Sequence, residues 1–513
     1  MSQPPSRPPP EDPEEISQAD DAVVGRAIRG SLVALAVLVA GAGVAYGVLR
    51  TRKPAGPVRV TTLAAPLAAP QAARARVPAA RFTEVSREAG LAFRHETGAA
   101  GEKLLPETMG GGVAFLDVEG DGDADLLLVN SRPWPWTAAG DAGRTAPGVA
   151  LYRNDSAGGN LRLTDITAGS GMEAPFYGMS VAVGDYDNDG RPDVLLGGVG
   201  GSRLFHNEGG GRFRDVTAAA GVAGEASDWA SAAAWLDLDN DGDLDLFAAR
   251  YVRWSREIDA EVGYKIDGTT RAYGPPMNFQ GTFPRLYRND GGGRFTDISA
   301  ASGVQVKNPA TGVPAAKSLG VSPADLNRDG WVDLVVANDT VQNFVFLNQR
   351  NGTFREAGAE SGLAFDSYGN TRGAMGIDAA RFTPDGRLAF AIGNFANEMT
   401  ALYVEQPGGT PELPLYADEA LSWGVGGPSR DPLKFGVVFL DYDLDGRLDL
   451  LSVNGHLEAE ISKVQHGQRY EQAAQLFWNG GDAGFVAVTT NEAGADLFRP
   501  IVGRGSAYAD LDG

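Results

Sequence analysis

Short apolar runs alternate with acidic, glycine-rich segments along most of the chain. In "GDYDNDGRPDVLLGG", residues 184–198, an acidic segment leads directly into an apolar run. Apolar runs of this length, bounded by Gly and Pro, favour buried strands over helices. The same order of acidic segment and apolar run recurs along the chain, so we expect an all-β protein built from short strands.

The acidic segment has the spacing of a calcium-binding loop. Calcium takes six to eight oxygens at about 2.3–2.6 Å, and alternate residues of a tight loop can turn their oxygens inward. Gly190 at position 6 permits the sharp turn, and position 7 supplies only a backbone carbonyl. An EF-hand is excluded, because position 12 is Leu196 rather than a bidentate Glu and strands flank the loop. The predicted ligands are Asp185, Asp187, Asp189 and Asp193, with Arg191 at position 7.

Four further loops repeat this spacing, and none has an acid at position 12. Repetition of one spacing with the same missing Glu strengthens the calcium interpretation. With the residue at position 7 given last, the predicted ligands are Asp117, Glu119, Asp121, Asp125 and Asp123; Asp237, Asp239, Asp241, Asp245 and Asp243; Asp325, Asn327, Asp329, Asp333 and Trp331; and Asp441, Asp443, Asp445, Asp449 and Arg447. Asp510 and Asp512 begin one more copy.

A second phrase recurs between the loops and reads as a hairpin. "LFHNEGGGRFRDV" from Leu204 and "LYRNDGGGRFTDI" from Leu286 each give strand, Asn/Gly turn and strand. Two strands joined by an acidic loop, followed by a hairpin, make a four-stranded unit with a period of roughly 50–90 residues, which is typical of a β-propeller. A worn copy at residues 373–394 keeps Asp378 and Asp385 without the ligand pattern, so we expect a blade there without metal.

Counting the worn copy, the units predict a seven-bladed propeller. Residues 81–93 resemble the closing strand of a unit, and residues 509–513 resemble the start of one. We therefore expect the seventh blade to be shared between the two ends and to be incomplete at the C-terminus, as in a fragment of a longer protein.

The N-terminal region divides into three parts before the propeller at 81–513. Residues 1–29 are acidic and Pro-rich, which is typical of a disordered tail. Residues 30–49 carry no charge and are long enough for one transmembrane helix. Residues 50–80 are rich in Pro and Ala and predict an extended linker. The alternative for the apolar segment is a cleaved signal peptide.

Two features of the chain point to opposite sides of the membrane. More basic residues follow the span than precede it, which places the propeller in the cytosol. Extracellular calcium modules, however, bind calcium with a Kd of about 10⁻⁴–10⁻³ M, which cytosolic calcium cannot fill, and large domains translocate largely regardless of charge. We therefore expect an extracytoplasmic propeller, in the periplasm or at the cell surface.

Composition narrows the chemistry. The formal net charge is −22 and no basic stripe is present, so nucleic acid is not an expected partner. The chain has no cysteine, which excludes disulfides and thiolate catalysis. Two insertions, from Ser131 and from Tyr251, carry aromatic residues that either anchor a partner or pack over the rim of the ring. These aromatic residues are Trp134, Trp136, Trp254, Tyr264 and Tyr273.

Three classes of function are compatible with these features. A protein-interaction or adhesion module at the cell envelope is favoured, with an unknown protein or glycan partner, and a membrane-tethered scaffold is hard to separate from it. The alternative is a calcium-dependent polysaccharide lyase or hydrolase. His456, near Glu458 and Glu460, is the best single catalytic candidate, whereas His206 takes the arginine place of a repeat phrase and is expected to be structural. No catalytic motif is present, so we predict no enzymatic activity.

The loops between strands resemble the FG-GAP/VCBS repeats of the integrin α-subunit N-terminal propeller. Longer phrases, such as "HETGAAGEKLLPETMGGGVAFLDVEGDGDADLLLVN" and "GRGSAYADLDG", are similar to the cartilage acidic protein family, whose bacterial members carry an ASPIC/UnbV domain after the propeller. The resemblance covers about residues 81–513. It implies a seven-bladed, calcium-binding, extracytoplasmic propeller used in adhesion or protein interaction, with calcium held by the loop aspartates named above.

Overall fold

The computed structural model describes residues 32, 41, 76–137, 148–173 and 175–512. The chain divides into two compact units, residues 1–71 and 72–513, and every element named below belongs to the second. The predicted tail at 1–29 lies outside the described residues, as do most of the predicted linker and nearly all of the predicted span at 30–49. Within the described residues, no helix is long and apolar enough to cross a membrane.

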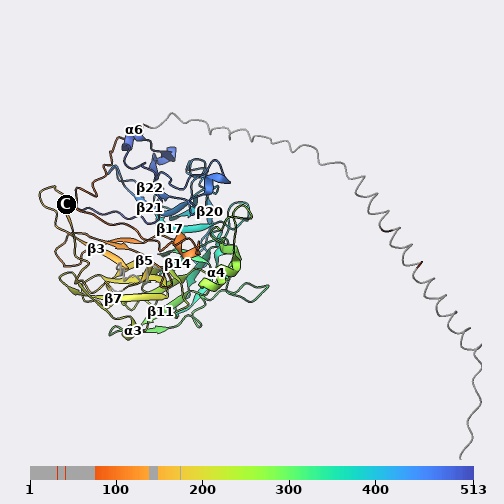
Figure 1. Ribbon diagram of the computed structural model, residues 1–513, viewed down its shortest axis with the longest axis horizontal. Helices are drawn as coiled ribbons and strands as arrows, with labels where there is room; N and C mark the ends of the chain where they lie inside the picture. The colour runs from red at the N-terminus through yellow and green to blue at the C-terminus, as the bar shows by residue number, and fades with distance from the viewer. Residues whose placement is uncertain (1–31, 33–40, 42–75, 138–147, 174, 513) are drawn as a thin grey trace, which may run out of the picture. The chain divides into compact units, whose positions relative to one another are not determined.

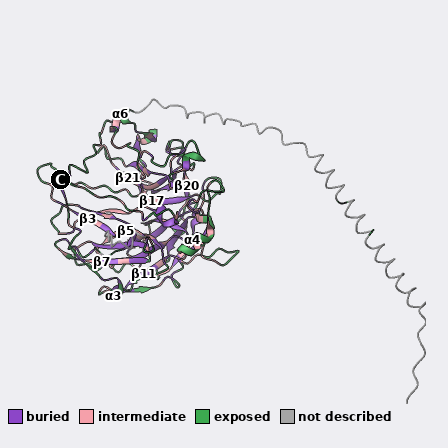
Figure 2. Cartoon of the chain, viewed as in Figure 1, coloured by how far each residue is buried: buried purple, intermediate pink, exposed green. Residues whose placement is uncertain are grey.

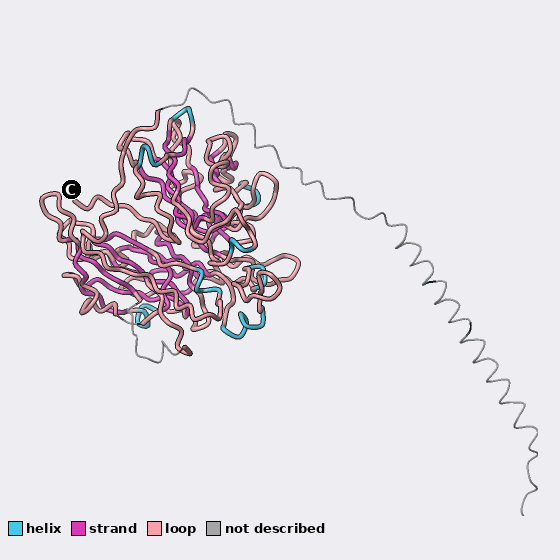
Figure 3. The backbone as a smooth tube through the Cα atoms, turned by 45° about the horizontal axis from the view of Figure 1, so that its top comes forward, coloured by secondary structure: helices cyan, strands magenta, loops and turns pink. Residues whose placement is uncertain are grey.

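Six antiparallel four-stranded sheets make up the described ring, and each is a meander of four consecutive strands (Figures 1 and 3). We number these blades in chain order. Their strands are β1 (Val113–Leu116), β2 (Asp125–Val129), β3 (Val149–Asn154) and β4 (Leu163–Asp165); β5 (Tyr177–Gly184), β6 (Asp193–Val199), β7 (Gly201–Gly209) and β8 (Arg212–Asp215); β9 (Ala230–Leu236), β10 (Asp245–Arg250), β11 (Arg285–Asn289) and β12 (Phe295–Asp297); β13 (Ser318–Ala324), β14 (Asp333–Asn338), β15 (Phe344–Asn348) and β16 (Phe354–Glu356); β17 (Ala374–Ala380), β18 (Ala389–Asn394), β19 (Ala401–Glu405) and β20 (Tyr416–Asp418); and β21 (Lys434–Leu440), β22 (Asp449–Asn454), β23 (Gln475–Asn479) and β24 (Phe485–Ala487).

Short helices lie in the connections between strands. Three of the α-helices directly follow the fourth strand of a blade, and α4 belongs to the insertion after β10. The helices are α3 (Thr217–Ala220), α4 (Arg256–Val262), α5 (Gly358–Ser361) and α6 (Thr490–Ala493), with 3₁₀ turns η1 (Leu105–Thr108), η2 (Pro276–Asn278), η3 (Ile461–Lys463) and η4 (Gly481–Ala483).

The two predicted links within a blade are confirmed. Each acidic loop joins the first and second strands, and its position 9 begins the second strand, as in the pairs Leu116 with Asp125 and Gly184 with Asp193. The hairpin phrase forms the third and fourth strands. The second strands are buried at almost every position, as in β6 and β14, which reflects a sheet whose two faces both pack on neighbouring blades.

The apolar core lies between adjacent blades rather than within one sheet. Val335 and Leu347 of blade 4 pack against Phe390, Ile392 and Tyr403 of blade 5, and all five are at least 99% buried. Similar clusters join the other neighbouring blades. Figure 2 shows the strands as mainly buried, with the exposed residues in the loops. The acidic loops are therefore held at fixed places by the packed sheets.

The worn copy forms a complete blade, as predicted, from β17 to β20. Asp378, however, lies within β17 and not in the loop, and its Oδ2 accepts a hydrogen bond of 2.8 Å from the backbone N–H of Phe439 in blade 6. The segment equivalent to an acidic loop is residues 381–389, in which Asp385 and Gly386 take positions 5 and 6.

The described residues form six blades and not the predicted seven, because residues 81–93 form no strand and pair with no other strand. Residues 81–93 contact both neighbouring blades. Phe82 N–H donates to Ala493 O at 2.9 Å, and Ala89 O accepts from Leu163 N–H at 2.6 Å. From the other end of the chain, Leu511 O accepts from Asn154 Nδ2 at 3.0 Å.

Candidate metal sites and the central cavity

The Asp at position 1 closes each acidic loop. In residues 185–193, the Asp185 carboxylate accepts the backbone N–H groups of Asp189 and Gly190 at 3.0 and 2.8 Å. The loops that begin at Asp117, Asp237, Asp325 and Asp441 repeat both bonds. The glycines at position 6 have φ between 84° and 94°, a left-handed conformation that explains why glycine occurs there.

Carboxylates converge in three of the five loops. Groups of three, with one oxygen each within 4.8 Å of the others, are Asp185, Asp187 and Asp189; Asp237, Asp239 and Asp245; and Asp441, Asp443 and Asp449. Such a group could hold a metal ion, because a cation offsets the repulsion between the carboxylates. The shared spacing does not produce such a group in every loop: among the described residues, the loops at 117–125 and 325–333 bring no such trio together.

These two loops differ from the other three at position 3, where the converging loops have Asp. In the loop at 117–125, position 3 is the longer Glu119, whose Oε1 lies 3.6 Å from Arg153 Nε. In the loop at 325–333, position 3 is the neutral Asn327, and its Nδ2 donates to Asp329 at 3.0 Å. Asp329 also pairs with Arg350 at 2.8 Å.

The Asp at position 9 is buried and joins the loop to the following hairpin. Asp245 Oδ2 accepts from Leu238 N–H at 2.8 Å, and its Oδ1 accepts from Asn289 N–H at 2.7 Å. Burial raises the pKa of these carboxyls, to about 6 for Asp193 and to about 7 for Asp245, Asp333 and Asp449, with a rise also at Asp125. A cation beside such a carboxylate lowers its pKa and favours the ionised form.

The Asn at or near the end of the third strand, present in five of the six described blades, was missed as a functional residue. Asn289 Nδ2 donates to Tyr186 O of the preceding blade at 2.8 Å, and Asn348 Nδ2 donates to Leu238 O at 2.8 Å. Asn207 and Asn479 make the equivalent bonds at 3.3 and 3.1 Å. Each Asn therefore links one blade to the acidic loop, or its equivalent, of the blade before it. The recurring Asn of the hairpin phrase was the signal in the sequence.

The residues at position 7 do not all behave alike. Arg191 and Arg447 turn back onto the position-5 carboxylates, Asp189 and Asp445, with which they form ion pairs. The other three residues at position 7 form no such ion pair, whereas the backbone N–H of position 7 donates to the position-5 carboxylate in all five loops, as Trp331 does to Asp329 at 2.9 Å. A guanidinium that pairs with the position-5 carboxylate competes with a bound cation for the carboxylate oxygen. The loops at 185–193 and 441–449 therefore offer an ion less negative charge than their number of Asp residues suggests.

His206 faces the acidic loop of its own blade. Its Nδ1 lies 3.3 Å from both Asp187 Oδ2 and Asp193 Oδ1, and the three residues form a further group within 4.8 Å. At the C-terminal end, Asp512 N–H donates to Asp510 Oδ1 at 3.4 Å.

The loop at residues 381–389 has an arginine at position 1, where each acidic loop has an aspartate. Arg381 stands at position 1 and donates to Gly386 O at 3.0 Å. Arg387 stands at position 7 and pairs with Asp385 at 2.9 Å. Glu405 replaces the hairpin Asn and pairs with Arg328 of the preceding loop at 2.8 Å. This loop is closed by guanidinium groups of the chain itself.

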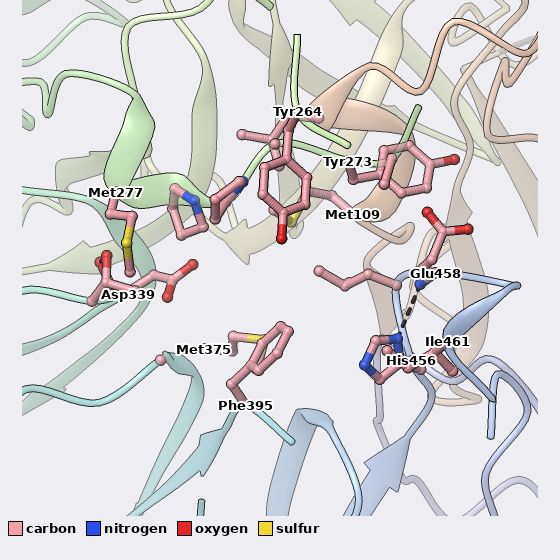
Figure 4. Close-up of a pocket in the computed structure, with 18 of the residues that line it drawn as sticks. Met109, Tyr264, Tyr273, Met277, Asp339, Met375, Phe395, His456, Glu458 and Ile461 are labelled. Atoms are coloured by element: carbon pink, nitrogen blue, oxygen red, sulfur yellow. Dashed lines mark hydrogen bonds between the residues drawn. The ribbon is translucent and has the colours of Figure 1, made fainter. Parts of the chain in front are cut away.

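A cavity of about 540 Å³ lies where the first strands of blades 4, 5 and 6 begin (Figure 4). Leu319 of β13, Met375 of β17 and Phe435 of β21 line it, together with the insertions around Tyr264 and His456. Arg504 lies against the Phe435 ring at 4.2 Å and gives its N–H groups to backbone carbonyls. The acceptors are Thr108, Gly455, Gly503 and His456.

The structure brings His456 and Glu458 to the wall of this cavity, whereas Glu460 is not among its lining residues. His456 Nδ1 accepts from Glu458 N–H at 3.0 Å, so the ring proton belongs on Nε2. Burial and the neighbouring Arg504 lower the pKa of His456 to about 4, which leaves the ring neutral at pH 7. No sequence signal pointed to Asp339 and Glu398, which join this wall from blades 4 and 5.

The aromatic residues of the insertions separate into two groups. Trp134 and Trp254 are more than 90% buried and stack at 5.4 Å between ring centroids, so they pack over the rim, as one of the two interpretations predicted. Trp136 and Tyr264 remain 39% and 37% exposed. Tyr273 OH lies 3.3 Å from Glu107 Oε2.

Comparison with known proteins finds a family of repeats that matches parts of this chain, and distant relatives of the chain. Residues 117–196, 185–248, 277–336 and 325–392 match the FG-GAP-like repeat family. Cartilage acidic protein 1 from Mus musculus is 24% identical over 437 residues, covering 71% of this chain and 60% of the mouse protein. The human protein is 23% identical over 392 residues, covering 70% of this chain and 49% of its own length. The chain thus spans about half to three-fifths of these relatives.

Among solved structures, an Agrocybe aegerita protein described as recognising non-reducing terminal N-acetylglucosamine is similar at a TM-score of 0.41 and 16% identity, covering 76% of this chain and 83% of that one. A TM-score this low carries no argument about fold or function. The repeats and the sequence relatives carry the assignment: the chain contains FG-GAP-like repeats and is a distant homologue of cartilage acidic protein 1 over about 70% of its length.

Proposed function

We propose that this chain is a calcium-binding propeller of seven ring positions that acts outside the cytoplasm as a protein-interaction module. The observation that carries the proposal is the repeated acidic loop, closed by its first Asp and held rigidly between packed blades. Calcium is the ion that fits, because the ligand sets are almost entirely carboxylate oxygens with backbone carbonyls available at position 7.

A seventh ring position is supported by a repeated backbone contact. In four blades, the first or second residue of the fourth strand donates its N–H to the carbonyl that ends the preceding unit, and Phe82 makes the same bond to Ala493 after blade 6. Leu511 O takes the place that Leu238 O and Tyr186 O have in the loops, since it accepts from the hairpin Asn of the next blade. The other bonds of the series are Leu163 to Ala89, Phe213 to Ser170, Phe354 to Ser302 and Phe485 to Trp423.

The interaction surface proposed here is the Trp136 patch, formed by Trp136, Arg256 and Glu102. Trp136 is 39% exposed and stacks on buried Trp134 at 4.9 Å. Arg256 lies over the Trp136 ring at 4.9 Å and pairs with Glu102 at 2.8 Å. Exposed Trp and Arg held in place by neighbours are typical of interface hot spots.

The insertion that supplies Arg256 to this patch is fixed by a buried carboxylate. Asp259 of α4 accepts from Trp254 Nε1 at 2.8 Å and from Leu105 N–H at 2.7 Å, and it pairs with Arg271 at 2.9 Å. The insertion therefore presents a preorganised surface, which lowers the entropy cost of binding. An extracytoplasmic location, with residues 30–49 as the anchor, fits the weak calcium affinity of such loops.

The test uses a chain that begins at residue 72, where the compact unit starts. We expect calcium to bind with a stoichiometry close to the number of intact loops, and we expect the protein to co-sediment with cell-envelope fractions in calcium but not in EDTA. Trp136→Ala should reduce co-sedimentation. Tyr368→Ala is the matched control, because Tyr368 is 79% exposed and lies outside the patch. Unchanged co-sedimentation of both variants would exclude the patch, and absence of calcium binding would exclude the metal assignment.

A further inference from the structure

The cavity at the start of the first strands combines an apolar wall with a strong excess of negative charge. Tyr264, Phe395, Met109 and Met375 face the open space from opposite sides (Figure 4). Its lining also contains three carboxylates, Asp339, Glu398 and Glu458, whereas none of the described lining residues is Lys or Arg. The volume of about 540 Å³ is in the usual range for a small-molecule site.

Two of these carboxylates have no ion-pair partner among the described residues. Asp339 accepts from Tyr251 OH at 2.6 Å, and Glu398 accepts from Gly373 N–H at 2.8 Å. Both groups flank Gly373, where an added Cβ would lie 3.3 Å from Asp339 Oδ1 and 3.6 Å from Glu398 Oε2. Two neighbouring carboxylates in an apolar wall repel each other and gain from a shared cation.

The nearest cations are already engaged elsewhere. Lys317, which acts on Asp339, donates to Pro276 O at 2.7 Å. Arg372 and Lys434 act on Glu398, but Arg372 pairs with Asp366 at 2.8 Å. Lys434 Nζ donates to three backbone carbonyls, those of Glu398, Ser429 and Pro432. The chain therefore leaves the charge of this carboxylate pair largely open to a ligand.

A second, independent observation points to a ligand in the same space. His456 and Glu458 are 96% and 95% buried, yet within the described part of the chain His456 Nε2 and Glu458 Oε2 have no hydrogen-bond partner. The other oxygen of Glu458 pairs with Lys103 at 2.7 Å. Buried polar atoms are normally satisfied, so the unpaired His456 Nε2–H calls for an acceptor in the cavity. A ligand hydroxyl supplies such an acceptor.

We propose that this cavity binds a small organic ammonium ion that carries a hydroxyl group. The ammonium lies against Asp339 and Glu398, the apolar body packs against Tyr264, Phe395 and Met375, and the hydroxyl accepts from His456 Nε2–H. The site is separate from the acidic loops, and its test does not depend on whether the proposed interaction module is correct.

Binding of an ammonium ion is linked to pH through Asp339. Burial and the negative charge of Glu398 raise its pKa to about 7, against the opposing effects of the Tyr251 hydrogen bond and of Lys317. A bound cation favours the ionised carboxylate, so the ligand binds more tightly above pH 7 and less tightly below it. Binding near pH 7 releases protons, which calorimetry in buffers of different ionisation enthalpy detects.

The probe is tyramine, measured by calorimetry on the full chain in saturating calcium. We expect tyramine to bind at pH 8. We expect 4-ethylphenol, which lacks the amine, to bind at least about tenfold more weakly, because a hydrogen bond to a charged group is the stronger kind. Phenethylamine, which lacks the hydroxyl, should bind about two- to tenfold more weakly. No tyramine binding up to about 10 mM, or equal binding of 4-ethylphenol, overturns the proposal.

Variants separate the cavity from general effects on folding. Glu398→Gln should weaken tyramine binding by about tenfold. Glu356→Gln is the matched control, because Glu356 is also a half-buried carboxyl with a raised pKa that accepts a backbone N–H at 2.7 Å, but it lies outside the cavity. Met277→Lys, at a 69% exposed lining residue, tests the charge without touching the core. It should weaken tyramine binding and leave 4-ethylphenol unchanged. Equal weakening by Glu356→Gln, or unchanged binding by both cavity variants, overturns the assignment.

Discussion

The acidic loops and the loop at 381–389 occupy the same place in their blades but carry opposite charge. Asp237, Asp239 and Asp245 converge within 4.8 Å, whereas the equivalent positions of the other loop are Arg381, Thr383 and Ala389. Both loops join complete first and second strands. The difference shows that blade packing holds the connection in place, and that the carboxylates are an added requirement for binding an ion.

The arginines also show how a loop of this shape can close without an ion. Arg387 Nη1 donates to Glu405 O at 3.1 Å, and Arg191 Nε makes the equivalent bond to Asn207 O at 2.8 Å. In the loop at 381–389 the positive charge comes from the chain itself. Five experiments test this contrast between the loops, and they are taken in order of decreasing effect.

Removal of calcium should have the largest effect, because it acts on all acidic loops at once. A site with a Kd of about 1 mM contributes about 1.4 kcal/mol at 10 mM calcium, so five sites contribute about 7 kcal/mol. For a ring of this size that corresponds to a Tm change on the order of 8 °C. Thermal melts in 10 mM calcium and in EDTA measure it. Identical melts would contradict calcium binding in the loops.

The calcium-free protein should lose stability as pH rises from 5 to 8. Burial raises the pKa of Asp245, Asp333 and Asp449 to about 7 in the folded state. Their stabilising contribution is therefore present while they are protonated and is lost as pH rises towards the folded pKa. Calcium should make the stability depend less on pH. The loop at 381–389 should not contribute to the pH dependence, because its position 9 is Ala389. Urea unfolding in EDTA across this pH range tests the sign.

The bonds between blades should matter more at an acidic loop than at residues 381–389. Asn348→Ala removes the donor to Leu238 O and Val332 O, and we expect it to cost about 2 kcal/mol. Glu405→Ala removes an ion pair with Arg328, which is 58% exposed, and a hydrogen bond of 3.1 Å from Leu388 N–H, and it should cost less, about 1 kcal/mol. Urea unfolding in saturating calcium compares the two. Equal costs would show that the Asn has no special part in joining blades.

A single ligand substitution should remove one ion and leave the ring folded. Asp241→Ala deletes position 5 of its loop, so the calcium stoichiometry should fall by one and the stabilisation at 10 mM calcium by about 1.4 kcal/mol. Asp385→Ala, at the same position of the other loop, should leave the stoichiometry unchanged. Calorimetric titration with calcium measures the stoichiometry of both variants. An unchanged stoichiometry in Asp241→Ala would remove that loop from the set.

The smallest effect is expected at Arg381. Its side chain is 44% exposed and lies 3.9 Å from Glu405, so Arg381→Ala should cost about 0.5 kcal/mol. The cost should be the same with and without calcium, as measured by urea unfolding. A cost that appears only in calcium would mean that this loop also senses the ion.

Much of each blade could be predicted from the sequence, because the patterns that indicate its loops and strands extend over only a few neighbouring residues. The spacing of Asp185 to Asp193 and the apolar run after it place a loop before a strand, and the structure has both. The prediction was less accurate at the two ends of the propeller region. Residues 81–93 have the sequence of a closing strand but form none, because a strand needs a neighbour to complete its hydrogen bonds.

The repeated unit, the position of each acidic loop and the all-β architecture follow from the sequence alone, because strand periodicity and turn residues act over a few neighbouring positions. Tertiary packing decides which carboxylates converge, that Trp134 and Trp254 are buried, and which side chains line the cavity. The polar ones among them are Asp339, Glu398, His456 and Glu458. The physical reason is distance along the chain: the residues of the cavity come from different blades, and they meet only because one sheet packs on the next.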